Sequence, residues 1–112
     1  MSIAYQDVVS EQVSNSDSTI YTCPAAAKSA HIQFANATNK DASAATITVN
    51  LVQSGDVVAT TNEYIAGKSI TSGATDGLSN VINAVLLPGD FISVIAGTAS
   101  AINLKLGIKE IY

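Results

Sequence analysis

The sequence contains few charged side chains and few aromatic ones. Charged residues make up 12% of the 112 residues, about half the usual share, whereas 47% are hydrophobic. All five cations are lysines, and the formal net charge is −4. Because nucleic-acid binding needs cations that neutralise phosphates, and base recognition depends strongly on arginine, we expect no nucleic-acid partner. So little charge on an apolar chain also predicts that its surface is covered by neighbouring subunits.

Cysteine is nearly absent, and no segment is suited to targeting or to membrane insertion. Cys23 is the single cysteine, which excludes an intrachain disulfide and a cysteine-based zinc site. Its small apolar surroundings predict a buried, unreactive thiol. The N-terminal stretch MSIAYQDVVSEQ has neither the basic nor the apolar region of a signal peptide. No stretch approaches the ~18 apolar residues of a membrane span. We therefore expect one domain that is made and kept inside a cell, without membrane contact.

Residues that could carry chemistry do not form a recognisable pattern. His31 is the only histidine, and it alternates with Ile32 on an expected strand, which places it on a solvent or interface face. No EF-hand, GxGxxG or P-loop motif occurs. We predict no catalytic, cofactor-binding or metal-binding residues and no enzyme activity. A hydrolase remains a distant alternative if folding pairs two of the scattered carboxylates: Asp7, Glu11, Asp17, Asp41, Asp56, Glu63, Asp76, Asp90 and Glu110.

Alternation of apolar and polar residues with period two is the dominant signal in the chain. In ATITVNLV and in INLKLGIK, one face is apolar and the other carries Thr, Asn and Lys. This pattern is typical of strands that bury one face. We predict that these strands share one core, formed in part by Ile47, Val49, Leu51, Ile102, Leu104, Leu106 and Ile108.

Further strands are expected on both sides of these two. In HIQFAN, the alternation predicts that Ile32 and Phe34 face inward. The turn at 54–56 is expected to lead into a partner strand that starts at Val57. The segment 91–96, FISVIA, is apolar on both faces, which indicates a central strand or one that another subunit covers.

Turn residues separate these runs at short intervals. Pro88-Gly89 is typical of a type II turn, and it precedes two apolar runs between Val85 and Ile111 that we expect to close the fold as a hairpin. Four acidic residues also fall in expected turns: Asp41, Asp56, Asp76 and Asp90. Short strands with regular turns indicate a sandwich or a barrel. We predict an all-β, antiparallel sandwich that is either Ig-like or jelly-roll-like.

Two segments leave alternatives open. Apolar residues in 78–86 follow helical spacing, so a short helical turn with Asp76 as its N-cap is possible there, although β-branched residues and asparagine disfavour it. Residues 1–17 are apolar at Ile3, Val8, Val9 and Val13. They form either an arm that docks onto a neighbouring copy or an ordinary first strand, and residues 18–112 form a single sandwich domain.

The order of these features resembles the small virion proteins of tailed bacteriophages and cyanophages. The matching segments are STIYTCPAAAKSAHIQFANAT, SAATITVNLVQSGD, YIAGKSI and LLPGDFISVIAGTASAINLKLGIKEI, which together span about residues 18–111. The long Ser/Gly/Asn-rich segment 70–83 departs from that pattern. The matching positions are Ile20, Tyr21 and Pro24, Asn36, Thr46 to Leu51, Gly89, Asp90 and Ile92, and Glu110.

The resemblance implies a non-catalytic, adhesive role. Such proteins decorate or cement the outside of a capsid, or form part of a tail or fibre, including a host-binding tip. They commonly work as homotrimers and are assembled in the host cytoplasm. The implied partners are other copies of the chain and either the major capsid protein or tail proteins. From the residues alone, an intracellular, non-catalytic binding module remains the rival interpretation.

Overall fold

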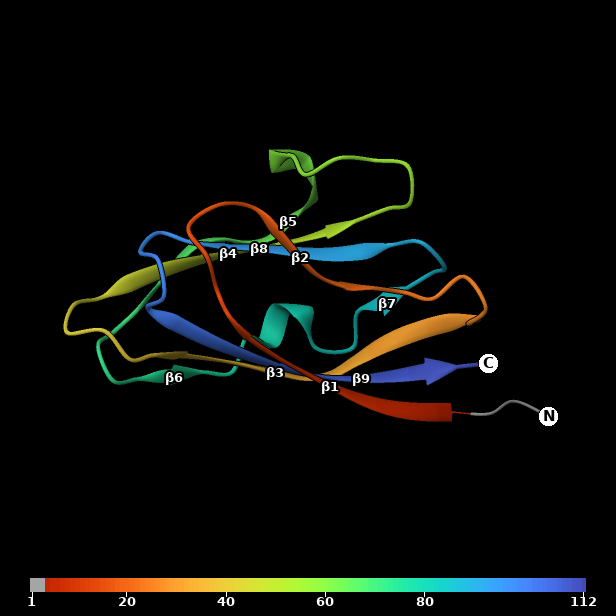
Figure 1. Cartoon of the computed structure of the whole chain (residues 1–112), viewed down its shortest axis with the longest axis horizontal. Coiled ribbons are helices and arrows are strands. Elements are labelled where there is room, and N and C mark those ends of the chain that lie inside the picture. Colours follow the sequence, from red (N-terminus) through yellow and green to blue (C-terminus); the bar gives the residue numbers. More distant parts are fainter. Residues whose placement is uncertain (1–3) are drawn as a thin grey trace.

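Nine β-strands form two antiparallel sheets in residues 4–112, the part of the chain that the computed structural model describes (Figure 1). Two short 3-10 helices, η1 (Thr60–Asn62) and η2 (Ser79–Val81), lie in the connections. The strands in chain order are β1 (Ala4–Gln12), β2 (Ser18–Thr22), β3 (Ser29–Asn39), β4 (Ala45–Val52), β5 (Glu63–Ile70), β6 (Thr75–Asp76), β7 (Val85–Leu86), β8 (Phe91–Ala96) and β9 (Ile102–Ile111).

The strand order is that of a jelly roll. Sheet I has the order β1-β9-β3-β6, with β7 also paired to β3, and sheet II has the order β2-β8-β4-β5. The chain crosses from one sheet to the other at most connections, which is the double Greek key of a jelly roll. The all-β, antiparallel sandwich is thereby confirmed, and the jelly-roll alternative is the one that the topology follows.

The C-terminal part of the chain does not form the expected hairpin. β8 pairs with β2 and β4 in sheet II, whereas β9 pairs with β1 and β3 in sheet I. The Gly97–Ser100 segment therefore passes between the sheets. The type II turn before β8 is confirmed, because the Asp90 amide donates to the Leu87 carbonyl at 2.9 Å and Gly89 has a φ of 88°. β8 is also the central strand that its two apolar faces indicated.

The core between the sheets follows the predicted alternation with one exception. Ile47 and Val49 of β4 are buried, together with the four apolar residues predicted for β9. Leu51 is only partly buried, so its prediction was wrong. It faces the core side of β4 opposite Ile92, but at the end of the sandwich where the two sheets leave a hollow.

A β-bulge in β3 reverses the predicted direction of Phe34. The pairing of β3 with β9 shifts between Ile32 and Phe34, so that Ile32 lies opposite Ile108 while Phe34 lies opposite Gly107. Ile32 is buried, as predicted, whereas Phe34 is 40% exposed on the outer face of sheet I. The prediction that Phe34 faces inward was therefore wrong, because one extra residue exchanges the two faces of the strand.

The segment after β4 is a folded loop and not the start of a strand. β5 begins at Glu63, six residues after the expected start at Val57. The loop lies over the outer face of sheet II (Figure 1), where Asn50 is buried beneath it. The Asn50 side-chain amide donates to the Ala59 carbonyl at 2.9 Å and to Asn62 Oδ1 at 2.7 Å. These hydrogen bonds explain why a run with high strand propensity leaves the sheet.

The segment between β5 and β8 closes one side of the sandwich. The helical turn expected within 78–86 is present as η2, but Leu78 occupies the N-cap position that was assigned to Asp76. Asp76 lies instead in β6 and pairs with Lys68 of β5 across the two sheets, at 3.2 Å. No helix in residues 4–112 is long and apolar enough to cross a membrane.

Candidate assembly surface

The single histidine and the single cysteine have structural surroundings. His31 Nε2 lies 3.1 Å from the Ser29 hydroxyl, and its cross-strand neighbour is Lys109, a cation and not a carboxylate. Cys23 is buried, as predicted. Burial raises the pKa of its thiol, and the negative charges of Glu110 and Asp90 raise it further. The thiolate form that a nucleophile or a metal ligand needs is therefore disfavoured.

Glu110 joins two tyrosines at the end of the sandwich where the C-terminus lies. Tyr21 of β2 donates to Glu110 Oε2 at 2.5 Å, and Tyr112 donates to Glu110 Oε1 at 2.9 Å. Burial raises the pKa of Tyr21 well above its usual range, and the hydrogen bond and negative charge of Glu110 act in the same direction. This cluster ties sheet II to sheet I. Among the described residues, no three His, Cys, Asp or Glu side chains gather as metal ligands would.

Exposed apolar side chains gather in two places on the described surface. Tyr64 and Val85, which are 48% and 51% exposed, line a single hollow, and Val57 and Leu87, which are 69% and 58% exposed, directly follow its lining residues Asp56 and Leu86 in the chain. The other two, Val8 and Phe34, lie together on the outer face of sheet I. Because exposed apolar groups that cluster mark interaction sites more often than scattered ones do, these two places form the candidate assembly surface.

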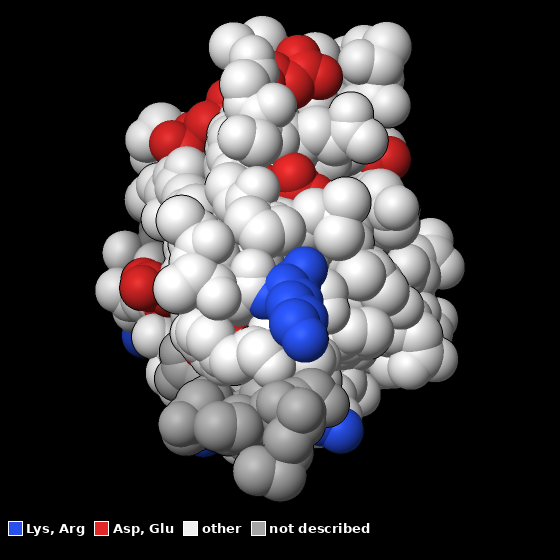
Figure 2. Space-filling view, turned by 90° about the vertical axis from the view of Figure 1, so that its right-hand side faces the viewer, with Lys and Arg blue, Asp and Glu red and all other residues white. Residues whose placement is uncertain are grey.

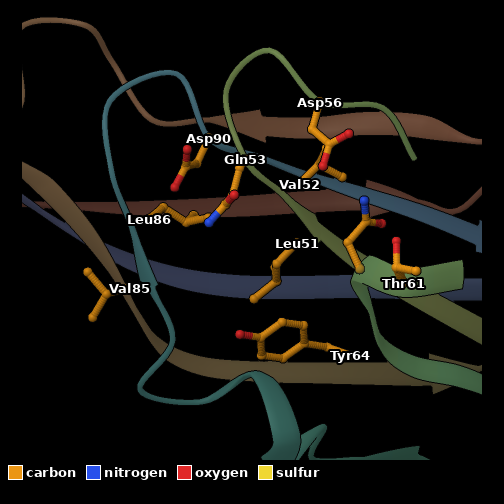
Figure 3. A pocket seen from close by; sticks show the side chains of 10 residues that line it. Leu51, Val52, Gln53, Asp56, Thr61, Tyr64, Val85, Leu86 and Asp90 are labelled. Carbon is orange, nitrogen blue, oxygen red and sulfur yellow. The ribbon is translucent and has the colours of Figure 1, made fainter. Parts of the chain in front are cut away.

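The hollow opens where the two sheets diverge beside the loop 53–62. It has a volume of about 310 Å³, and its apolar lining consists of Leu51, Val52, Tyr64, Val85 and Leu86. In Figure 3 the Tyr64 ring lies next to Leu51, with Val85 across from them and the acidic side chains along the upper edge. A hollow of this size accepts one or two side chains of a partner, and it lies near the lower limit for a small-molecule site.

The walls of the hollow are held by hydrogen bonds to backbone amides. Asp90 accepts one from the Ser54 amide and one from the Leu87 amide, both at 2.9 Å, and so joins the end of β4 to the turn before β8. Asn62 donates to the Val57 carbonyl at 2.8 Å and fixes the loop. Asp56, the second carboxylate that lines the hollow, accepts from the Val57 amide. These two carboxylates therefore shape the loops that surround the hollow.

The outer face of sheet I carries exposed side chains. Val8 of β1 and Phe34 of β3 both lie opposite Gly107 of β9, and the Phe34 ring occupies the space that a side chain at Gly107 would fill. The Gln6 amide donates to Gln33 Oε1 across β9 at 2.5 Å. This arrangement places two apolar side chains side by side over a glycine, flanked by amides. We call Val8, Phe34 and Gly107, with the lysines on either side of Gly107, the sheet I patch.

Charge is distributed unevenly between the two sheets. Lys105 and Lys109 flank Gly107 on β9 and face outward with it from sheet I. Asp56 and Glu63 are exposed in and after the loop over sheet II. Figure 2, which keeps the vertical direction of Figure 1, shows acidic side chains mainly in the upper half, on the side of sheet II, and lysines lower down.

Comparisons with known proteins identify the fold but no family. No family model matches the chain, and no curated protein matches its sequence. The structure is similar to a chain of the Bacillus endospore appendages, which form disulfide-linked pili, with 14% identity and a TM-score of 0.56 over 99% of this chain and 87% of that one.

Two further similar structures come from viruses. A chain of the T13 particle of infectious bursal disease virus is 10% identical with a TM-score of 0.58, and the match covers 98% of this chain but 30% of that one. A chain of the capsid of Helicobacter pylori bacteriophage KHP30 is 10% identical with a TM-score of 0.51, over 100% of this chain and 92% of that one. The jelly roll of this chain thus occurs in capsids and in a pilus.

Sequence analysis anticipated only Val8 of the candidate assembly surface, as part of an N-terminal arm that would dock onto a neighbouring copy. Phe34 was assigned to the core, and Val57 to a strand. The available signal was the excess of apolar over charged residues, which predicted a covered surface without locating it.

Proposed function

We propose that this chain is a structural component of a virion and acts by adhesion, without chemistry of its own. The observation that carries this proposal is the whole-chain likeness to a capsid chain of bacteriophage KHP30, which covers 100% of this chain and 92% of that one. The sheet I patch and the hollow supply the exposed apolar area that adhesion requires. Each square ångström of apolar surface removed from water contributes about 25 cal/mol, and the gain repeats in every copy.

Within the virion, the proposed role is capsid decoration, with the chain cementing the outside of the head. The chain has 112 residues, and its hollow of about 310 Å³ is small, which suits a subunit that binds a lattice through its surface. Its net charge of −4 opposes contact with packaged DNA and suits the exterior. The partners are the major capsid protein and other copies of the chain, as a homotrimer.

A tail or fibre component is the second candidate. The likeness to a chain of the Bacillus endospore appendages favours it, because that likeness also extends over most of both chains and that chain forms pili. Both candidates require adhesion between copies, and they differ in which part of the virion the chain binds.

Addition of purified protein to particles that lack it tests the proposal. Heads produced from a phage genome without this coding sequence are incubated with the protein in low salt and in about 1 M salt, and are then heated. Exposed ion pairs contribute little and are screened by salt, whereas apolar burial persists. We therefore expect binding and thermal stabilisation of heads in both conditions. Binding to tails alone would support the fibre candidate, and binding to neither would contradict a virion role.

A further inference from the structure

We propose that the hollow of one copy receives the sheet I patch of the next copy. The contact is heterologous, because it joins two different surfaces of the same chain. This inference rests on the proposed assembly role and names the surfaces by which copies adhere to one another. Four of the six exposed large apolar side chains described belong to these two surfaces: Tyr64 and Val85 line the hollow, and Val8 and Phe34 lie on the patch.

Both surfaces present exposed apolar side chains beside polar ones. The hollow is concave, with a volume of about 310 Å³, and Tyr64, Val85 and Leu87 expose apolar atoms at or beside its mouth. On the sheet I patch, Val8 is a neighbour of Phe34, whose ring lies over Gly107. The walls of the hollow are more polar than apolar, so the apolar pair of the patch would meet its apolar atoms at Leu51, Tyr64 and Val85.

Charge favours this pairing over like-with-like contact. Asp56 and Asp90 line the hollow, and Glu63 lies on the adjoining start of β5. Lys105 and Lys109 flank the patch, and the outward-facing residues described on β3 and β9 carry no carboxylate. Two hollows that met would bring carboxylates together, and two patches would bring lysines together. The hollow of one copy against the patch of another joins opposite charges, which sets the orientation of the contact.

A heterologous contact has a definite consequence for assembly. Copies joined by this contact form a closed ring if the rotation from one copy to the next is a whole fraction of 360°. Otherwise they form an open filament. A ring of three gives the homotrimer of a decoration protein, and an open series gives a fibre. In either case every copy uses both surfaces, except at the ends of an open series.

Two variants, each defective in one surface, test the contact. The hollow variant is Val85→Asp with Leu87→Asp, and the patch variant is Val8→Asp with Lys105→Glu. All four side chains are exposed, so the fold should be retained. Lys40→Glu, in the exposed turn after β3, makes the same charge change as Lys105→Glu but outside both surfaces, and it is the control.

Analytical ultracentrifugation at micromolar concentration gives the readout. The native chain and Lys40→Glu are expected to associate, and each double variant alone is expected to lose at least about tenfold in self-affinity. An equimolar mixture of the two double variants should form a dimer and stop there. In that dimer the intact hollow of the patch variant binds the intact patch of the hollow variant.

Other outcomes would overturn the inference. A mixture that stays monomeric while the native chain associates would show that copies adhere through other surfaces. Double variants that each associate like the native chain would show the same. A native chain that is monomeric at about 100 µM would exclude the contact. The head-binding experiment does not depend on these results, so failure of the self-contact and failure of the virion role are distinguishable.

Discussion

The outer faces of the two sheets of this jelly roll differ in how far the chain itself covers them. Sheet II is covered by its own chain, because the loop 53–62 folds over it and buries Asn50, Val52 and Ser93. None of the described loops covers Phe34 and Lys105 on sheet I in this way, and both side chains lie exposed. In one sheet the sequence specifies what occupies the outer face. In the other it leaves a surface with an apolar centre, which is available to another molecule.

This difference explains how a chain with so little charge remains folded and still adhesive. The loop over sheet II provides hydrogen-bond partners for the polar groups that it buries. Ordering the loop costs conformational entropy, and the hydrogen bonds of the asparagines offset this cost. The polar side chains on the outer face of sheet I can bind water and need no partner within the chain. The apolar pair on this face, Val8 and Phe34, lies over Gly107. We therefore expect substitutions on sheet II to affect stability and substitutions on sheet I to affect association.

The largest effect on stability is expected in the core that the two sheets share. Leu104→Ala removes a side chain that is 1% exposed and should lower the free energy of unfolding by about 2–5 kcal/mol, because it leaves a cavity. Lys105→Ala, the next residue of β9 on the outer face, should change it by less than about 0.5 kcal/mol. Urea denaturation measures both. Similar losses in the two variants would contradict the assigned faces of β9.

Asn50→Ala should have the next largest effect, because it removes the hydrogen bonds that hold the cover on sheet II. We expect a loss of about 1–3 kcal/mol, since polar groups of the loop lose buried partners. Asn36→Ala, the same change at an exposed position of sheet I, should be nearly neutral. Amide hydrogen exchange should also become faster in the loop 53–62. Equal stability of the two variants would show that the cover contributes nothing.

A smaller effect is expected for the aromatic ring on the outer face of sheet I. Phe34→Ala uncovers Gly107 and should cost about 0.5–1 kcal/mol, the usual contribution of a cross-strand aromatic contact. Val57→Ala, at a side chain that is 69% exposed in the loop, should cost less. The two urea midpoints decide this. A larger loss of stability for Val57→Ala than for Phe34→Ala would show that the loop over sheet II, and not sheet I, contains the more stabilising apolar contact.

The smallest effect at neutral pH is expected from the ionisation of Tyr21, the tyrosine of β2 that joins the two sheets. The pKa of Tyr21 is raised in the folded chain, so above the ordinary tyrosine pKa of about 10 the unfolded chain loses this proton first. The contribution of Tyr21 to stability should therefore be constant below about pH 10 and should fall as the pH rises further. Cys23, whose pKa is also raised, adds a decrease that begins at lower pH.

Tyr21→Phe tests this pH dependence. Comparison of urea midpoints at about pH 8 and about pH 10.5 should show a smaller decrease in the variant than in the native chain. Cys23 is present in both proteins, so its contribution cancels. An equal decrease in the two proteins would show that Tyr21 is not the titrating group.

The sequence predicted the fold class and much of the core because alternation reports burial directly. β9 keeps period two without interruption, so the buried side of Ile102, Leu104 and Leu106 could be assigned from residues alone. β3 does not keep it, because its bulge depends on pairing with a distant strand. No local signal marks that pairing, and the direction of Phe34 was therefore predicted wrongly.

The candidate assembly surface could not be predicted because it arises from tertiary contacts. VVATT has the propensity of a strand, and only the hydrogen bonds of Asn50 and Asn62 hold it in a loop. That loop forms one side of the hollow, and β7, more than twenty residues further along the chain, forms another. The apolar run 91–111 likewise gave no indication that its two strands belong to different sheets.

Lysine footprinting of intact virions tests the central claim, that the outer face of sheet I is a surface of assembly. Purified particles and the free monomeric chain are acetylated under the same conditions, and modification of Lys40, Lys105 and Lys109 is compared by mass spectrometry. We predict that the chain is present in the particles, that Lys105 and Lys109 are protected there, and that Lys40 stays reactive. Absence of the chain from the particles, or equal reactivity of Lys105 in particles and in the free chain, would contradict this account.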